Sequence, residues 1–136
     1  MKTTGYSGTP LAKKLGIKEH FKLLLINTPA HYFDLLVDLP KILEINESSP
    51  QDLIHYFTKQ LSELDRELPF LKSQIKDNGM IWISWPKKSA KVPTDLTEDL
   101  IREIAIKNGL IDVKVCAVDE IWSGLKLVIP VKNRRI

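Results

Sequence analysis

Residues 52–85 read DLIHYFTKQLSELDRELPFLKSQIKDNGMIWISW, and they carry a strand–helix–strand pattern that sets the architecture. Residues 52–57 are rich in branched and aromatic side chains, which are typical of a strand. Apolar residues then recur at spacings of three and four over residues 61–75, and this spacing predicts an amphipathic helix that ends near Asn78-Gly79. Residues 80–85 form a continuous apolar run, the pattern of a strand buried on both faces. A parallel sheet covered by helices is therefore expected.

The segment before this pattern predicts another strand–helix–strand unit. Residues 22–27 are a short apolar run that ends at a turn signal, which is typical of a second buried strand. A cap and a first-position proline, Thr28-Pro29, then favour a helix over residues 30–39, followed by a short strand over residues 41–45. Residues 1–20 form a basic arm, within which residues 9–16 predict a short helix that ends at Gly16.

The segment after residue 85 completes the sheet. A basic loop over residues 86–93 leads to a helix that Thr97 caps and Asn108-Gly109 ends. Two further strands, residues 113–118 and 125–129, are joined by too short a turn for a crossover, so they form an antiparallel hairpin. The predicted fold is an open three-layer α/β sheet of the Rossmann-like type, with a parallel centre and a C-terminal antiparallel hairpin. All of residues 1–136 are assigned to one domain.

Composition excludes several classes of protein. The chain has 136 residues, of which 43% are hydrophobic and 27% are charged, as in ordinary globular domains. No apolar run approaches the about 20 residues that span a bilayer, so no membrane association is expected. A single cysteine, Cys116, excludes an intrachain disulfide and favours the cytoplasm. The net charge of +3 is too small to indicate nucleic-acid binding by itself.

The second half of the chain resembles the second half of a class I methyltransferase of the Rossmann-like type. Such proteins place a strand after a Gly turn, then a helix that ends at Gly, and then a closing hairpin. Here the matching segments are residues 79–85, 97–109 and 113–129. The resemblance implies a methyltransferase-like fold that has lost part of its first half.

Four longer segments resemble a bacterial family of small proteins whose domain has no assigned function. They are YSGTPLAKKLG (6–16), SWPKKS (84–89), VPTDLTED (92–99) and VKVCAVDEIWSGLK (113–126). The resemblance covers nearly the whole chain and implies no activity.

The expected loop for S-adenosylmethionine departs from the methyltransferase pattern. That class binds the molecule at a Gly-rich loop after its first strand, where the backbone approaches the ligand closely. Here the loop is Asn27-Thr28-Pro29-Ala30, which has no glycine, and Pro29 lacks an amide donor. Glu47 is at the position of the acidic residue that the class carries after its second strand, and this is the one feature of the site that matches. Methyl transfer and a bound cofactor are therefore not expected.

The carboxyl ends of the parallel strands are the expected ligand site, as in other open α/β sheets. The loops there carry Lys59, Lys87, Lys88 and Lys91, which suit an anion such as a phosphate or a nucleotide. The alternative is that lysines of an exposed loop only solubilise it. The candidate ligand-binding residues are Ser84, Trp85, Lys87, Lys88, Thr94, Asp95 and Trp122.

Catalytic motifs are sparse. The histidines His20, His31 and His55 have no metal-ligand spacing with one another or with Cys116, and no metal site is expected. His55 lies in a predicted buried strand and is interpreted as a hydrogen-bonded core residue. The first hypothesis is therefore a non-catalytic binding or regulatory module with an anionic ligand.

Two alternatives to that hypothesis stay open. One is a small enzyme acting on a phosphorylated or nucleotide ligand, in which Lys87 or Lys88 holds the anion and Asp95 moves a proton. The other is a structural subunit that docks a protein partner.

Overall fold

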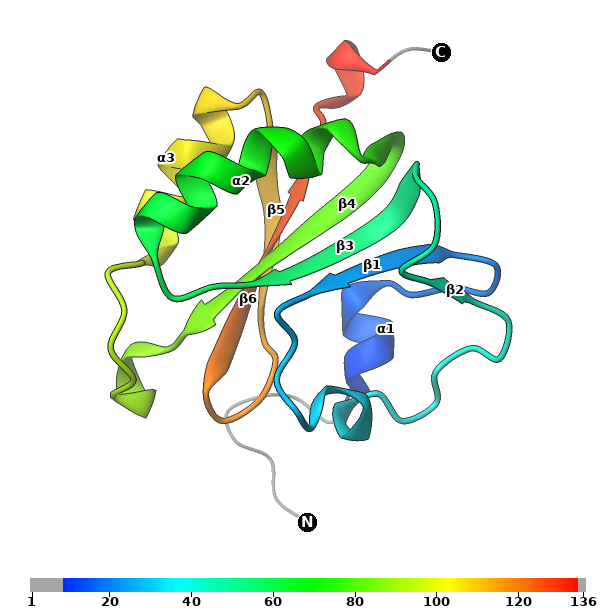
Figure 1. Ribbon diagram of the computed structural model, residues 1–136, viewed down its shortest axis with the longest axis horizontal. Helices are drawn as coiled ribbons and strands as arrows, with labels where there is room; N and C mark the ends of the chain where they lie inside the picture. The colour runs from blue at the N-terminus through cyan, green and yellow to red at the C-terminus, as the bar shows by residue number, and fades with distance from the viewer. Residues whose placement is uncertain (1–8, 135–136) are drawn as a thin grey trace.

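The computed structural model describes residues 9–134 and contains one six-stranded mixed sheet with helices on both faces (Figure 1). The strands are β1 (Lys22–Ile26), β2 (Glu44–Ile45), β3 (Gln51–Phe57), β4 (Ile75–Pro86), β5 (Ile111–Ala117) and β6 (Trp122–Val128). The α-helices are α1 (Leu11–Leu15), α2 (Leu61–Ser73) and α3 (Glu98–Lys107). Short 3-10 turns lie at Tyr32–Leu35, Lys88–Ala90 and Val131–Asn133.

The order of strands in the sheet is β2-β1-β3-β4-β6-β5. Strands β2, β1, β3 and β4 are parallel, and β6 pairs with β4 and β5 in antiparallel fashion. The predicted parallel centre and closing hairpin are thus confirmed, with β5 as the outer strand and β6 inserted beside β4. The chain moves from β1 outward to β2 and then from β3 outward to β4, so the direction of strand order reverses between β1 and β3.

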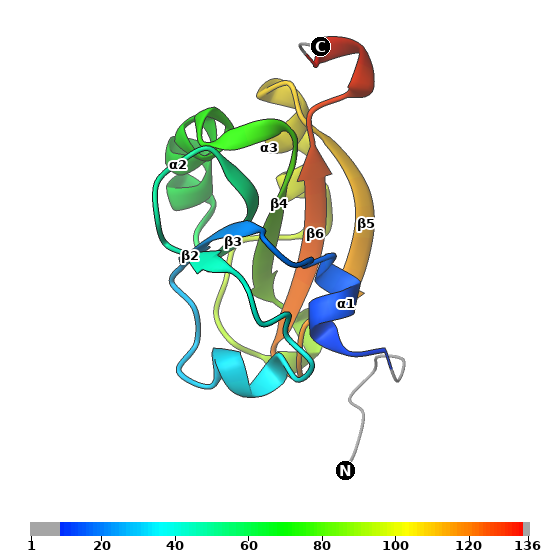
Figure 2. The same cartoon turned by 90° about the vertical axis from the view of Figure 1, so that its right-hand side faces the viewer.

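Two apolar clusters hold the three layers together. Helices α2 and α3 pack on one face over buried side chains that include Ile54, Ile81 and Leu125. Helix α1 and the 3-10 turn after β1 pack on the other face, over Leu53 and Trp82 among others. Figure 2 shows α1 on the side of the sheet away from α2. The indole Nε1 of Trp82 donates to the Leu15 carbonyl at 3.0 Å and ties α1 to the centre of the sheet.

The helix expected over residues 30–39 is wrong. Only Tyr32–Leu35 form a 3-10 turn, and most of the segment after β1 is irregular. Phe33 is 53% exposed, while Tyr32 is buried at 1%. The hydroxyl of Tyr32 lies 2.8 Å from the buried His55 Nδ1, so the segment turns to satisfy this contact. The strand expected over residues 41–45 is reduced to two residues.

The boundary between α2 and β4 also differs from the expectation. Helix α2 ends at Ser73, and β4 begins at Ile75, so Asn78 and Gly79 lie within the strand. A Cβ atom on Gly79 would lie 3.0 Å from the Gln51 carbonyl oxygen. Gly79 therefore permits a close approach of two backbones where the pairing of β3 and β4 shifts register.

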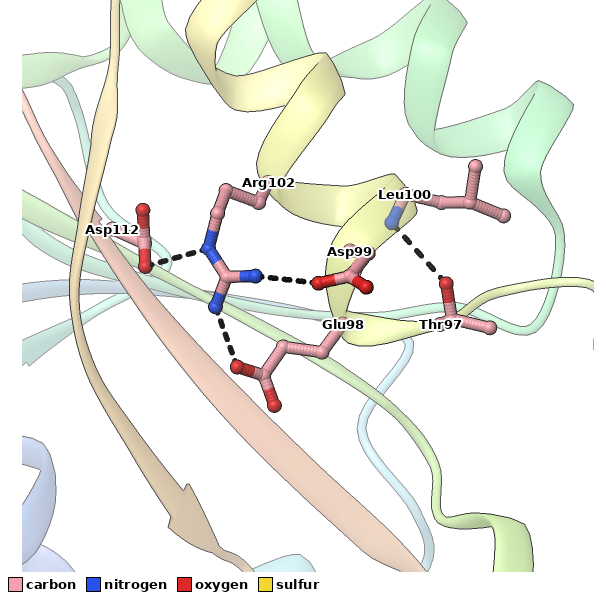
Figure 3. Close-up of polar contacts among 6 residues, drawn as sticks. All are labelled: Thr97, Glu98, Asp99, Leu100, Arg102 and Asp112. Atoms are coloured by element: carbon pink, nitrogen blue, oxygen red, sulfur yellow. Dashed lines mark hydrogen bonds and ion pairs between the residues drawn. The ribbon is translucent and has the colours of Figure 1, made fainter.

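Helix α3 is fastened at its start and along one side. The Thr97 hydroxyl accepts the Leu100 amide at 3.2 Å, which confirms the predicted cap. Figure 3 shows the Arg102 guanidinium contacting Glu98, Asp99 and Asp112, the last of these from β5. Hydrogen bonds to Asp112 and Glu98 raise the pKa of Arg102. No helix within residues 9–134 is long and apolar enough to cross a membrane.

Candidate functional site

The carboxyl ends of β1, β3, β4 and β5 lie at one edge of the sheet, and two hollows open there. The first, here called the Trp85 hollow, has a volume of about 460 Å³ and lies between the end of β4 and the start of α3. The second, here called the switch-point hollow, has a volume of about 320 Å³ and lies between the ends of β1 and β3. Ligands of open α/β sheets bind where strand order reverses, which in this sheet is between β1 and β3.

The Trp85 hollow brings together four of the seven candidate residues. Trp85, Lys87, Lys88 and Thr94 all line it. Trp85 ends β4 and is only 7% exposed, while Lys88 opens the 3-10 turn that follows. The Thr94 hydroxyl donates to the Lys59 carbonyl at 2.7 Å, which holds the basic loop against the start of α2. The hollow therefore combines an aromatic wall with two ammonium groups.

The charged groups around the Trp85 hollow differ in whether they have an ionic partner. Glu98 also lines it, but this carboxylate pairs with Arg102 (Figure 3). Lys87 and Lys88 form no ion pair with any carboxylate in the described part of the chain. Two cations without protein counter-ions beside an apolar ring make this hollow suited to an anion with an aromatic or other flat group.

The other three candidate residues lie elsewhere. Ser84 points to the opposite face from Trp85, because successive residues of a strand alternate faces, and it is fully buried. Asp95 accepts the Leu61 amide at 2.7 Å and so serves the start of α2. Trp122 lines the switch-point hollow and packs its ring against Phe57, with centroids 5.0 Å apart.

The switch-point hollow is framed by polar groups from β1, β3 and α2. Asn27 adopts a left-handed conformation with φ of 58° after β1, and its Nδ2 donates to the Phe57 carbonyl at 3.2 Å. The Thr58 hydroxyl donates to the Glu63 carboxylate. The sequence placed the loops of Asn27 and Thr58 at this edge, but Glu63 carried no signal because it belongs to the first turn of α2.

Beneath this edge, a chain of buried hydrogen bonds connects Tyr32, His55 of β3 and Ser84 of β4. His55 Nδ1 lies 2.8 Å from the Tyr32 hydroxyl, and His55 Nε2 lies 2.8 Å from Ser84 Oγ. Burial lowers the pKa of His55 to about 3, and burial also raises the pKa of the Tyr32 hydroxyl. All three groups are therefore neutral and shielded from solvent. The interpretation of His55 as a hydrogen-bonded core residue is confirmed, and Ser84 belongs to this core chain.

A hydrogen bond between His31 and Asp119 at the same edge was not expected. His31 Nε2 lies 2.7 Å from Asp119 Oδ2, and Asp119 also accepts the amides of Ile121 and Trp122 at 2.8 Å. The two residues are 88 positions apart. No local pattern indicates such a contact. It fastens the segment after β1 to the turn between β5 and β6.

The residues after β1 do not fit the S-adenosylmethionine site that the methyltransferase resemblance implies. The Asn27 side chain bonds to the Phe57 carbonyl, where the class has a glycine-rich backbone, and Pro29 supplies no amide donor. Glu47, the candidate acidic residue, is exposed after β2. Within residues 9–134, moreover, no group of three or more histidine, cysteine or carboxylate side chains is arranged to hold a metal ion.

Known proteins resemble this chain in structure but not detectably in sequence. No family model matches the sequence. No curated protein sequence matches it significantly. Membership of the bacterial family of unassigned function therefore stays a prediction.

The chain is similar to several solved methyltransferase structures. One is an S-adenosylmethionine-dependent methyltransferase from Aquifex aeolicus, with 17% identity and a TM-score of 0.64 over 88% of this chain and 87% of that one. The ribosomal protein L11 methylase of Lactobacillus delbrueckii subsp. bulgaricus has 12% identity and a TM-score of 0.56, covering 88% and 74%. The Methanococcus jannaschii fibrillarin pre-rRNA processing protein has 14% identity and a TM-score of 0.52, covering 93% and 71%. These likenesses and the strand order together show that the chain has the α/β fold of the class I methyltransferases, built on a mixed sheet of six strands.

Proposed function

We propose that this protein is a non-catalytic binding module that holds an anionic ligand, such as a nucleotide, in the Trp85 hollow. The observation that carries the proposal is the placement of Lys87 and Lys88 beside the Trp85 ring, with no carboxylate of residues 9–134 paired to either. Phosphate groups would contact the two ammonium groups, and a base or another flat group would lie against the indole.

The chemistry of the surrounding groups supports binding rather than catalysis. Asp95, the residue expected to move a proton in an enzyme, accepts the Leu61 amide at the start of α2. His55 is buried, and burial holds its pKa far below neutrality. Burial also raises the pKa of the Cys116 thiol, which disfavours the thiolate that a nucleophile needs.

A thermal-shift screen tests the proposal with adenine and guanine nucleotides, dinucleotides and inorganic phosphate. A ligand at 100 times its Kd stabilises a protein by about 2.7 kcal/mol, which moves the midpoint by several degrees. A Lys87→Ala, Lys88→Ala double variant should lose the shift. A Lys41→Ala, Lys132→Ala double variant removes the same charge from two exposed positions outside the hollow and should keep it.

A shift that survives in the Lys87→Ala, Lys88→Ala variant would contradict placement of the ligand in the Trp85 hollow. If no nucleotide or phosphate changes the midpoint, the proposal is wrong. The structural docking subunit then becomes the better hypothesis, and capture of a protein partner tests it directly.

The similar solved structures favour S-adenosylmethionine as a second candidate ligand, for the switch-point hollow. The Aquifex aeolicus protein is described as dependent on that molecule. The residues after β1 argue against this candidate, as described above. Including S-adenosylmethionine and its demethylated product in the same screen separates the two ligands, because their shifts should depend on Asn27 and not on Lys87.

A further inference from the structure

A second basic surface lies on the face of the sheet that packs against α1. Four lysines form it, and they come from α1, the residues after it, β5 and β6. Here they are called the lysine cluster: Lys14, Lys18, Lys114 and Lys126. None of them lines the Trp85 hollow or the switch-point hollow.

The sheet register places two of these lysines directly opposite each other. Lys114 of β5 pairs with Lys126 of β6, and Lys126 pairs on its other side with Trp82 of β4. Opposed residues of neighbouring strands point to the same face, and Trp82 contacts α1 through Leu15. Both ammonium groups therefore lie on the α1 side. Like charges in directly opposed positions destabilise a sheet.

Helix α1 adds a third ammonium group to this face. Lys14 Nζ donates to the Ala117 carbonyl at 3.3 Å, beyond the end of β5. Lys114 Nζ in turn lies 3.5 Å from the Lys14 carbonyl oxygen. An ammonium group has three donors, so this contact uses one donor of Lys114 and leaves others for a ligand.

Repulsion between lysines adds to burial in lowering pKa values within the cluster. Burial lowers the pKa of Lys14 most, the Cys116 thiol raises it, and the charges of Lys114 and Lys87 lower it further. Burial also lowers the pKa of Lys126, and Lys114 and Lys18 lower it further. The lysines thus lie within electrostatic range of one another.

Three lysines of the cluster have no carboxylate partner in the described part of the chain. Across residues 9–134, Lys18, Lys114 and Lys126 form no ion pair with an aspartate or glutamate. Asp119 lies past the end of β5, but it is occupied by His31 and two backbone amides. The cluster is therefore a concentration of positive charge that costs folding stability in the free protein.

We propose that the lysine cluster is a second anion site, which binds a small ligand with two or more linked phosphate groups. One phosphate group is too small to contact four ammonium groups that come from separate parts of the chain. A ligand with several linked phosphates carries negative charges spaced along its length, so that several lysines can each contact one. Bound phosphates would remove the repulsion between Lys114 and Lys126. The lysine cluster shares no residue with the lining of the Trp85 hollow, although Lys87 lies within electrostatic range of Lys14, and it does not depend on the function of that hollow.

Isothermal titration with inorganic tripolyphosphate at low ionic strength tests this proposal. The Lys114→Gln, Lys126→Gln double variant should lose at least tenfold in affinity. The Lys41→Gln, Lys132→Gln double variant loses the same net charge outside the cluster and should change affinity by less than twofold. The Lys87→Ala, Lys88→Ala variant should retain tripolyphosphate binding at the cluster, which separates failure of this proposal from failure of the first.

Thermal unfolding of the same variants without ligand supplies an independent readout. Because repulsion is relieved, the Lys114→Gln, Lys126→Gln variant should unfold at a higher temperature than the wild type. This result also shows that the variant folds. Equal affinity of the two glutamine double variants would overturn the proposal, as would wild-type binding no tighter than that of sodium sulfate at equal ionic strength. Tighter binding of a short single-stranded RNA than of tripolyphosphate would overturn the assignment to a small ligand.

Discussion

His31 and Asp119 join the segment after β1 to the turn between β5 and β6. His31 Nε2 lies 2.7 Å from Asp119 Oδ2, although the two residues are 88 positions apart in the sequence. Asp119 is the more buried partner, because its side chain is 8% exposed and that of His31 is 45% exposed. The same carboxylate accepts the amides of Ile121 and Trp122 and so shapes the turn between β5 and β6.

Asp119→Ala should destabilise the protein by about 1–3 kcal/mol, because buried amides of the turn lose their acceptor. His31→Ala should cost less, since a partly exposed ion pair contributes about 1 kcal/mol or less. Urea unfolding followed by tryptophan fluorescence measures both. Glu120→Ala is the control, because Glu120 is exposed and adjacent. Equal losses for Asp119→Ala and Glu120→Ala would contradict the role of Asp119.

Stability should fall as the pH decreases below about 6.5, because of His55. Burial lowers its pKa in the folded protein from the ordinary 6.5 to about 3, so the unfolded chain binds the proton first. The contribution of His55 is therefore complete above pH 6.5 and is lost with a slope of up to about 1.4 kcal/mol per pH unit below it. Denaturant unfolding at pH 7 and pH 5 should show a loss of about 2 kcal/mol from this group.

His55→Gln is the matched variant for this pH dependence. It keeps polar atoms beside Tyr32 and Ser84 but has no proton to gain in this range. Its stability at pH 7 should be lower than that of the wild type. The loss between pH 7 and pH 5 should be smaller by about 2 kcal/mol. An unchanged pH slope would show that His55 does not carry the effect.

Gly124→Ala should destabilise β6 through overpacking. A Cβ atom there would lie 3.2 Å from the Trp82 ring and 3.3 Å from a Val118 methyl group. Trp82 is fully buried and held by the Leu15 carbonyl, so it yields little. A loss of about 1–3 kcal/mol is expected and is measured by thermal unfolding. Ser123→Ala on the neighbouring position is the control, and a similar loss there would contradict the steric explanation.

Thr97→Ala should remove the cap of α3 and cost about 1 kcal/mol. The hydroxyl of Thr97 accepts the Leu100 amide at the helix start (Figure 3). Thr97→Ser keeps the oxygen and should restore most of the stability. Chemical denaturation of the three proteins checks this prediction, and a Thr97→Ser variant as unstable as Thr97→Ala would refute the capping explanation.

The sequence predicted those parts of the fold whose signals are local. Strand β3, helix α2 and the apolar end of β4 follow from periodicity within 34 residues, and Thr97 and Gly109 bound α3 as expected. The segment after β1 was predicted as a helix because Thr28-Pro29 is a local signal for the start of a helix. The contact of Tyr32 with His55, which is distant in sequence, overrides that local signal.

The candidate site divides in the same way. Trp85, Lys87, Lys88 and Thr94 come together because they are close in sequence at the end of one strand. Ser84 was wrongly placed in the site beside Trp85, because successive residues of β4 point to opposite faces of the sheet. Which of the two faces carries the hollow is clear only once the positions of the covering helices are known. The pair of His31 and Asp119, like the lysine cluster, depends on strand order, and no short motif encodes strand order.

Strand β6 is the last of the six strands in sequence, yet it lies between β4 and β5 and pairs with both. During synthesis, β4 and β5 therefore leave the ribosome before the strand that joins them. Until residues 122–128 emerge, the open side of β4 and the backbone of β5 expose unpaired amides and carbonyls to any other nascent chain. This strand order makes the nascent chain prone to incorrect strand pairing at the step just before the sheet is complete.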